Sequence, residues 1–132
     1  MPQTFSFTPG GLDPELEIAF KPLCLALSSE QAVELAERVL AHLETLRQVG
    51  LVNKTLDETT AQALTDRLAG LLAEFERLPE DHQLLVVGAA RYFTRSRDIQ
   101  PDFSSTAGFE DDVAVLNFVL QQIGRGNLRL EL

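Results

Sequence analysis

Carboxylates gather in one segment of this 132-residue chain, between Asp98 and Asp112. The segment reads Asp98-Ile99-Gln100-Pro101-Asp102-Phe103 and, after a short Ser/Thr-rich stretch, Gly108-Phe109-Glu110-Asp111-Asp112, so five carboxylates fall within fifteen residues. Carboxylate oxygens are the ligands that Mg²⁺ and Ca²⁺ prefer in proteins. The segment therefore contains a candidate cluster, functional or architectural, made of Asp98, Pro101, Asp102, Gly108, Asp111 and Asp112.

Two interpretations of this cluster stay open. In the metal interpretation, Asp98 and Asp102 converge on a divalent cation with one of Asp111 and Asp112, since adjacent helical residues point about 100° apart. In the architectural interpretation, the acids at 110–112 stabilise the positive end of a helix dipole by about 0.3–1 kcal/mol each. The acids of the turn then accept backbone N–H bonds or pair with basic residues of the preceding helix, Arg91, Arg95 and Arg97. We favour the architectural interpretation.

Other catalytic patterns are missing from the sequence: it has no Gly-rich phosphate loop, H-E-x-x-H, C-x-x-C or G-x-S-x-G. His42 and His82 fall on different predicted helices, and we expect both to be lone surface histidines, too few for most zinc sites. The single cysteine, Cys24, lies in an apolar run and is expected to be a small buried hydrophobe. We therefore expect no cofactor, and a divalent cation is the one alternative that the carboxylates leave open.

The net charge of −9 and the pI of about 4.6 bear on the class of partner. So acidic a chain repels phosphate backbones and anionic lipid surfaces, which argues against nucleic acid and membrane as partners. No apolar run approaches the roughly 20 residues of a transmembrane helix. The first ten residues lack the basic and apolar regions of a signal peptide, so we expect a cytoplasmic protein.

Two amphipathic helices are predicted between residues 29 and 78. Residues 28–31 (Ser-Ser-Glu-Gln) and 55–58 (Thr-Leu-Asp-Glu) each match a capping box, and apolar residues recur behind both at helical spacing. We expect Gly50 to end the first helix and Pro79 to end the second. A short loop joins the two, which predicts antiparallel neighbours. A first helix is predicted before them over residues 14–27, and Pro22 should interrupt it, leaving a short piece or a kink.

A more deeply buried helical hairpin is predicted over residues 79–123. Residues 84–90 are apolar all round, so their helix should be central, and Gly88 should let a neighbouring helix approach closely. Pro101 ends that helix, and a last helix from about Phe109 to Ile123 should pack against it. The predicted fold is one all-α domain, a bundle of four to five helices. Residues 4–8 and 128–132 alternate apolar and polar, which predicts short extended segments that could pair as a ribbon.

The hairpin also resembles a known family. Its residues Tyr92-Phe93, the stretch from Asp98 to Phe103, Gly108-Phe109, Asp111-Asp112 and Val115-Leu116 are similar to the core of the YkvA-like bacterial domain of unknown function. That core reads roughly Tyr-Phe, Asp-x-x-Pro-Asp-Phe and Gly-x-x-Asp-Asp on a helical hairpin. The resemblance covers Tyr92 to Leu120 only, and the chain departs from the family at Gln100 and at Ser104-Ser105. It implies a helical hairpin and no particular activity.

These observations lead to two hypotheses about function. The first is a non-enzymatic module that acts by protein–protein contact, either as a homodimer or with a basic partner. The alternative is a metal-binding protein or metal-dependent enzyme that uses Asp98, Asp102 and Asp111 or Asp112. Peripheral membrane contact ranks last, because the sequence contains no basic amphipathic helix.

Overall fold

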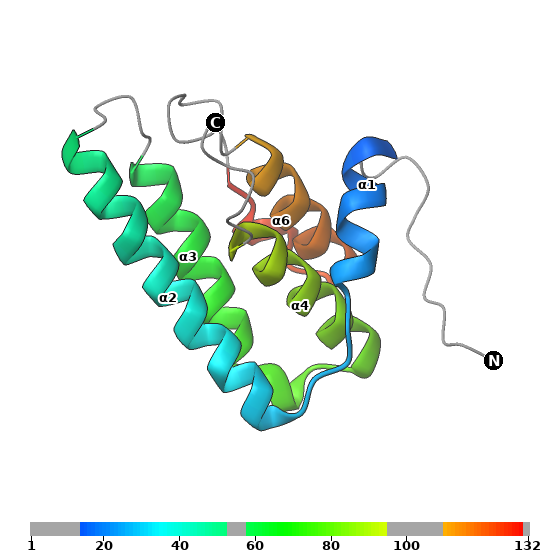
Figure 1. The fold of residues 1–132 in the computed structure, drawn as a ribbon. Helices are drawn as coiled ribbons and strands as arrows, with labels where there is room; N and C mark the ends of the chain where they lie inside the picture. Colours follow the sequence, from blue (N-terminus) through cyan, green and yellow to red (C-terminus); the bar gives the residue numbers. More distant parts are fainter. Residues whose placement is uncertain (1–13, 53–57, 95–109, 131–132) are drawn as a thin grey trace.

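The computed structural model describes residues 14–52, 58–94 and 110–130, which form five α-helices (Figure 1). The helices are α1 (Pro14–Phe20), α2 (Ser29–Val52), α3 (Glu58–Ala73), α4 (Glu80–Thr94) and α6 (Glu110–Gln122). Three short 3-10 turns accompany them, η1 (Lys21–Leu23), η2 (Phe75–Arg77) and η4 (Gly126–Leu128). The described residues contain no strand, and the predicted all-α fold class is confirmed.

The first helix breaks near Pro22, as predicted, but it does not extend to residue 27, because residues 24–28 are not helical. α1 gives way to η1 at Lys21, beside Pro22, which cannot donate a helical hydrogen bond. Residues 24–28, which we name the connector, then lead into α2. The capping box is formed, because the Ser28 N–H donates to Gln31 Oε1 at 2.9 Å and the Gln31 N–H donates to Ser28 Oγ at 3.1 Å.

Two further predicted helix ends are wrong. Gly50 does not end α2, which continues to Val52; a glycine inside a helix costs only about 1 kcal/mol, so it permits an end without imposing one. α3 ends at Ala73 rather than next to Pro79, and the chain tightens into η2. Leu78 is extended, as expected for a residue before proline, yet it stays buried. The second predicted capping box lies mostly outside the described residues.

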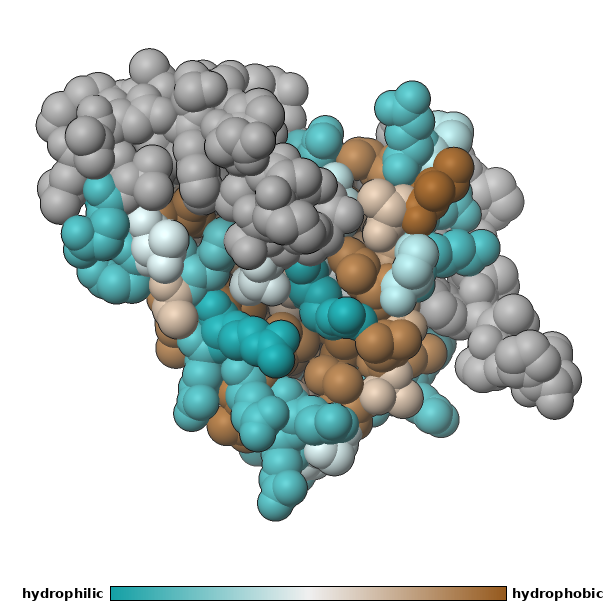
Figure 2. Space-filling view, in the orientation of Figure 1, coloured by the Kyte–Doolittle hydropathy of each residue, from teal (hydrophilic) through white to brown (hydrophobic). Residues whose placement is uncertain are grey.

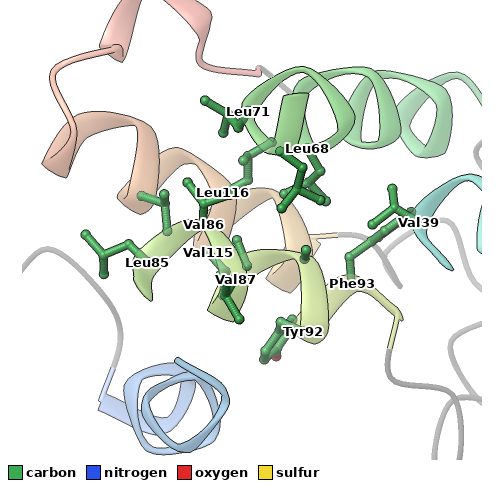
Figure 3. Packing of buried hydrophobic residues seen from close by; sticks show 14 of the residues in the cluster. Val39, Leu68, Leu71, Leu85, Val86, Val87, Tyr92, Phe93, Val115 and Leu116 are labelled. Atoms are coloured by element: carbon green, nitrogen blue, oxygen red, sulfur yellow. The ribbon is translucent and has the colours of Figure 1, made fainter. Parts of the chain in front are cut away.

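The core is built around α4. All of residues 84–90 are buried, and α4 contacts each of α1, α2, α3 and α6, as its apolar circumference predicts. α2 and α3 run side by side in opposite directions, and α6 packs on α4, which confirms both predicted pairings (Figure 1). In Figure 3, Leu68 and Leu71 of α3 point toward Leu116 of α6, and Val39 of α2 lies next to Phe93 of α4. These side chains belong to one continuous hydrophobic core.

Gly88 is a point of close approach between α4 and the N-terminal part of the chain. A Cβ atom at this position would lie 2.4 Å from Cys24 Sγ and 2.6 Å from Phe20 Cε1. Both distances are far below van der Waals contact, so the ring at the end of α1 occupies space that only glycine leaves open. The predicted role of Gly88 is confirmed, and its neighbours are α1 and the connector.

The C-terminal tail is held by side chains of the bundle. Gly124 turns the chain after α6 with φ of 80°, and the Arg125 guanidinium forms an ion pair with Glu74 at 2.6 Å. The Asn117 amide then bonds both backbone groups of Leu130, accepting from its N–H and donating to its C=O at 2.8 Å each. Leu128 ends η4, so the extended segment predicted from residue 128 begins instead as a 3-10 turn. The ribbon partner proposed for it, residues 4–8, lies outside the described residues.

Candidate functional site

Two of the six residues in the predicted carboxylate cluster lie in the described part of the chain. Asp111 and Asp112 occupy the first turn of α6, where Asp111 is exposed and Asp112 is half-buried. Carboxylates at this place complement the positive end of the helix dipole. The other four residues, Asp98, Pro101, Asp102 and Gly108, lie outside the described residues. Convergence of Asp98 and Asp102 with Asp111 or Asp112, on a metal ion or otherwise, therefore stays a prediction.

Metal-ligating side chains do not gather elsewhere in the described ranges. Within residues 14–52, 58–94 and 110–130, no three His, Cys, Asp or Glu side chains form a group that could hold a metal ion. The two histidines lie on α2 and α4, as predicted from the sequence. His82 is half-buried rather than fully exposed, and its backbone N–H donates to Asp81 Oδ1 at 3.0 Å.

Cys24 is a packing residue. It is buried against Gly88, and its thiol donates weakly to the Phe20 carbonyl at 3.6 Å. Burial raises the pKa of the Cys24 thiol to about 12, and the nearby charge of Arg91 opposes that rise only in part. The thiolate is the nucleophilic and metal-binding form, so a thiol held protonated is inert near neutral pH. The prediction of a small buried hydrophobe is confirmed.

His42 is not the exposed histidine that the sequence predicts. It is half-buried on α2, and its ring packs edge-on against Phe93 of α4 with the centroids 4.9 Å apart. Burial lowers the pKa of His42, so the ring is neutral at pH 7. The sequence gives no sign of this contact, because it depends on where α4 crosses α2.

One flank of α2 carries apolar side chains that stay in solvent. Val33 is 59% exposed and Leu40 is 52% exposed, and their spacing of seven residues puts both on one line along the helix. Glu30, Glu37 and Glu44 are exposed at the same seven-residue spacing and lie three or four residues from these apolar positions, so they border the line. We name these five residues the α2 stripe. Such heptad spacing is typical of positions that face a partner helix.

A hollow of about 230 Å³ lies on another part of the surface, between α2, α4 and the connector. Its apolar lining comes from Leu25, Leu27 and Leu35, and its polar lining comes from Gln31, Glu34, Arg38 and Arg91. Figure 2 shows apolar side chains gathered where the connector passes between α1 and α2, with hydrophilic side chains beside them. The hollow therefore combines an aliphatic lining with two guanidinium groups.

Neither the α2 stripe nor the hollow was predicted from the sequence. The α2 stripe had a usable signal, because Val33 and Leu40 repeat at seven residues next to a glutamate column with the same period. The hollow had no such signal, because its lining comes from positions as far apart as Leu25 and Arg91. Only the packing of α4 beside α2 brings them together.

No protein-family model, curated protein or solved structure matches the chain. The resemblance of residues 92–120 to the YkvA-like domain thus stays a prediction. No helix in the described ranges has the length and apolar character needed to cross a membrane.

Proposed function

We propose that this protein is a non-enzymatic helical module that binds another protein, and that its partner is a basic amphipathic helix lying along the α2 stripe. The observation that carries the proposal is the pairing of two exposed apolar side chains with a glutamate column of the same heptad period. In helix-in-groove and coiled-coil recognition, apolar residues at this spacing supply the buried seam and flanking charges select the partner.

The apolar positions can supply part of the affinity. Val33 and Leu40 each keep about half of their surface in water. Fully burying a side chain of this kind contributes about 1.5–3 kcal/mol, so covering the remaining halves contributes about 2 kcal/mol in total. Burial of the apolar residues of the partner helix would contribute a similar free energy, and the two contributions together favour binding along the α2 stripe.

The charges favour a basic partner over a second copy of the chain. Glu30, Glu37 and Glu44 border the apolar line, and the whole chain carries a net charge of −9. A second copy docked on the same stripe would place one glutamate column close to the other, and like charges across an interface oppose binding. Lysine or arginine on a partner helix would pair with the column instead, and the overall charge would speed the encounter.

Titration of a labelled peptide against the full chain tests this proposal. The peptide has three heptads with leucine at the seam positions and lysine at the flanking positions, and its matched control has glutamate at the flanking positions. We expect fluorescence anisotropy to show saturable binding of the basic peptide, weakened by salt, and no binding of the acidic peptide.

Two variants separate stripe binding from general attraction to an acidic surface. The double substitution Val33→Ser/Leu40→Ser should weaken basic-peptide binding at least tenfold, since each tenfold step corresponds to about 1.4 kcal/mol. Ile18→Ser is the matched control, because Ile18 is 73% exposed but lies on α1. If the double variant bound the peptide as tightly as the Ile18→Ser variant, the proposal would be wrong.

A second candidate function is divalent-metal binding through Asp98, Asp102 and Asp111 or Asp112. It is supported by the density of carboxylates in the sequence and by the placement of Asp111 in solvent at the start of α6. Thermal unfolding of the full chain in Mg²⁺, Mn²⁺ or Ca²⁺ tests it, because a ligand that binds the folded state must raise its melting temperature. An unchanged melting temperature at millimolar metal would rule it out.

A further inference from the structure

We propose that the hollow between α2, α4 and the connector binds a small monocarboxylate with a short aliphatic body. This site is separate from the α2 stripe. Arg38 lies five residues after Val33, which places it roughly 140° away around the helix axis. The two surfaces can therefore be tested independently.

The size and lining of the hollow set the body of the ligand. Leu35 forms a buried wall, only 3% exposed, while Leu25 and Leu27 close the side formed by the connector. The volume of about 230 Å³ is below the roughly 300–1,000 Å³ that is typical of sites for drug-sized ligands. An aliphatic body of a few carbons fits this space, and a long acyl chain does not.

The charged groups set the head of the ligand. Two arginines and one glutamate line the hollow, so its local charge is positive on a chain whose net charge is −9. Arg91 Nη1 donates to the Leu23 carbonyl at 3.1 Å, which fixes the guanidinium while several of its five N–H donors remain for a ligand. Arg38 makes no ion pair with any described residue. A planar guanidinium is the side chain best suited to bind a carboxylate through two parallel hydrogen bonds.

The carboxylate of Glu34 favours a ligand with a single negative charge. Glu34 lies one helical turn before Arg38 and lines the same hollow. Its negative charge would oppose a phosphate dianion more strongly than a carboxylate monoanion. The same head and body occur in a free short-chain acid and at the carboxyl terminus of a peptide that ends in an aliphatic residue, so the experiment must separate these two sources.

Chemical-shift titration of the isotope-labelled full chain provides the test, with hexanoate as the first probe. We expect saturable shifts in the connector and in residues 31–38, with a dissociation constant of about a millimolar, which is reasonable for so small a ligand. Hexylammonium and hexanol have the same body without the negative head and should not saturate. N-acetyl-leucine represents a peptide terminus, and tighter binding of it than of hexanoate would identify the peptide as the source.

Three charge variants complete the experiment. Arg38→Gln should weaken hexanoate binding about tenfold through loss of a charge-assisted contact, and Glu34→Gln should strengthen it. Arg129→Gln is the matched control, since Arg129 is exposed and does not line the hollow. Circular dichroism would confirm that each variant is folded. The proposal is wrong if hexanoate fails to saturate at ten millimolar, if hexylammonium binds equally well, or if the Arg38 and Arg129 variants bind alike.

Discussion

Replacing Gly88 with alanine gives the sharpest test of how the bundle is packed. The added Cβ would lie 2.4 Å from Cys24 Sγ and 2.6 Å from Phe20 Cε1. Both side chains are buried and Phe20 is wholly inaccessible to solvent, so neither can swing into open space. Relief requires α1 and the connector to shift away from α4.

The expected loss of stability combines two opposing effects. Overpacking a core in this way costs about 1–3 kcal/mol, and the upper end applies because two buried groups must move. Alanine is better than glycine by about 1 kcal/mol inside a helix, which offsets part of that cost. The net expectation is a loss of about 2 kcal/mol in the free energy of unfolding, or a decrease in Tm of about 8 °C for a chain of this length.

Urea denaturation of matched glycine variants measures this effect. Gly70→Ala in α3 is the control, because a Cβ there meets nothing within 4 Å and the substitution should stabilise the protein by up to about 1 kcal/mol. Adding Cys24→Ala to the Gly88→Ala variant should be less harmful than the sum of the two single changes, because it removes one of the clashing atoms. If Gly88→Ala stabilised the protein as Gly70→Ala does, the close approach of α1 to α4 would be refuted.

Three further substitutions have defined outcomes. The hydroxyl of Thr65 is buried without a hydrogen-bond partner, so Thr65→Val should raise stability by about 1 kcal/mol; a lower urea midpoint would show that the hydroxyl is satisfied. Asn117→Ala removes both hydrogen bonds to the Leu130 backbone and should speed amide exchange of Leu130 more than tenfold, whereas an unchanged rate would mean that the tail is held by other contacts. Burial lowers the pKa of His42 in the folded chain. As the pH falls below about 6.5, His42 therefore takes up a proton more readily in the unfolded chain than in the folded chain, and the free energy of unfolding should decrease. A His42→Gln variant should lose that part of the pH dependence in urea midpoints measured from pH 7 to pH 5, and an identical slope would contradict the burial of His42.

Local signals in the sequence predicted much of the fold. The capping box at Ser28 and Gln31, the break at Pro22 and the central position of residues 84–90 depend on hydrogen bonds, proline geometry or apolar periodicity within a few residues. Gly88 was also identified correctly, since a glycine in an otherwise bulky apolar helix indicates a close neighbour. These features need no knowledge of the tertiary contacts.

Features that depend on packing between helices were predicted poorly. Gly50 permits a helix to end, but α2 continues to Val52. His42 lies among polar residues in the sequence, and only the crossing of α4 buries it against Phe93. The side chains of the hollow belong to three separate elements. No periodic pattern connects such positions, so they become neighbours only once the bundle is assembled.

The proposed docking surface is tested most directly by locating where the basic amphipathic peptide binds. Amide hydrogen exchange of the full chain, with and without saturating peptide, would map the contact residue by residue. Binding along the α2 stripe predicts added protection centred on Val33 and Leu40, together with loss of the effect in the Val33→Ser/Leu40→Ser variant. Changes spread evenly over the acidic surface, or centred on α3 or α6, would contradict the proposal that α2 is the partner-binding helix.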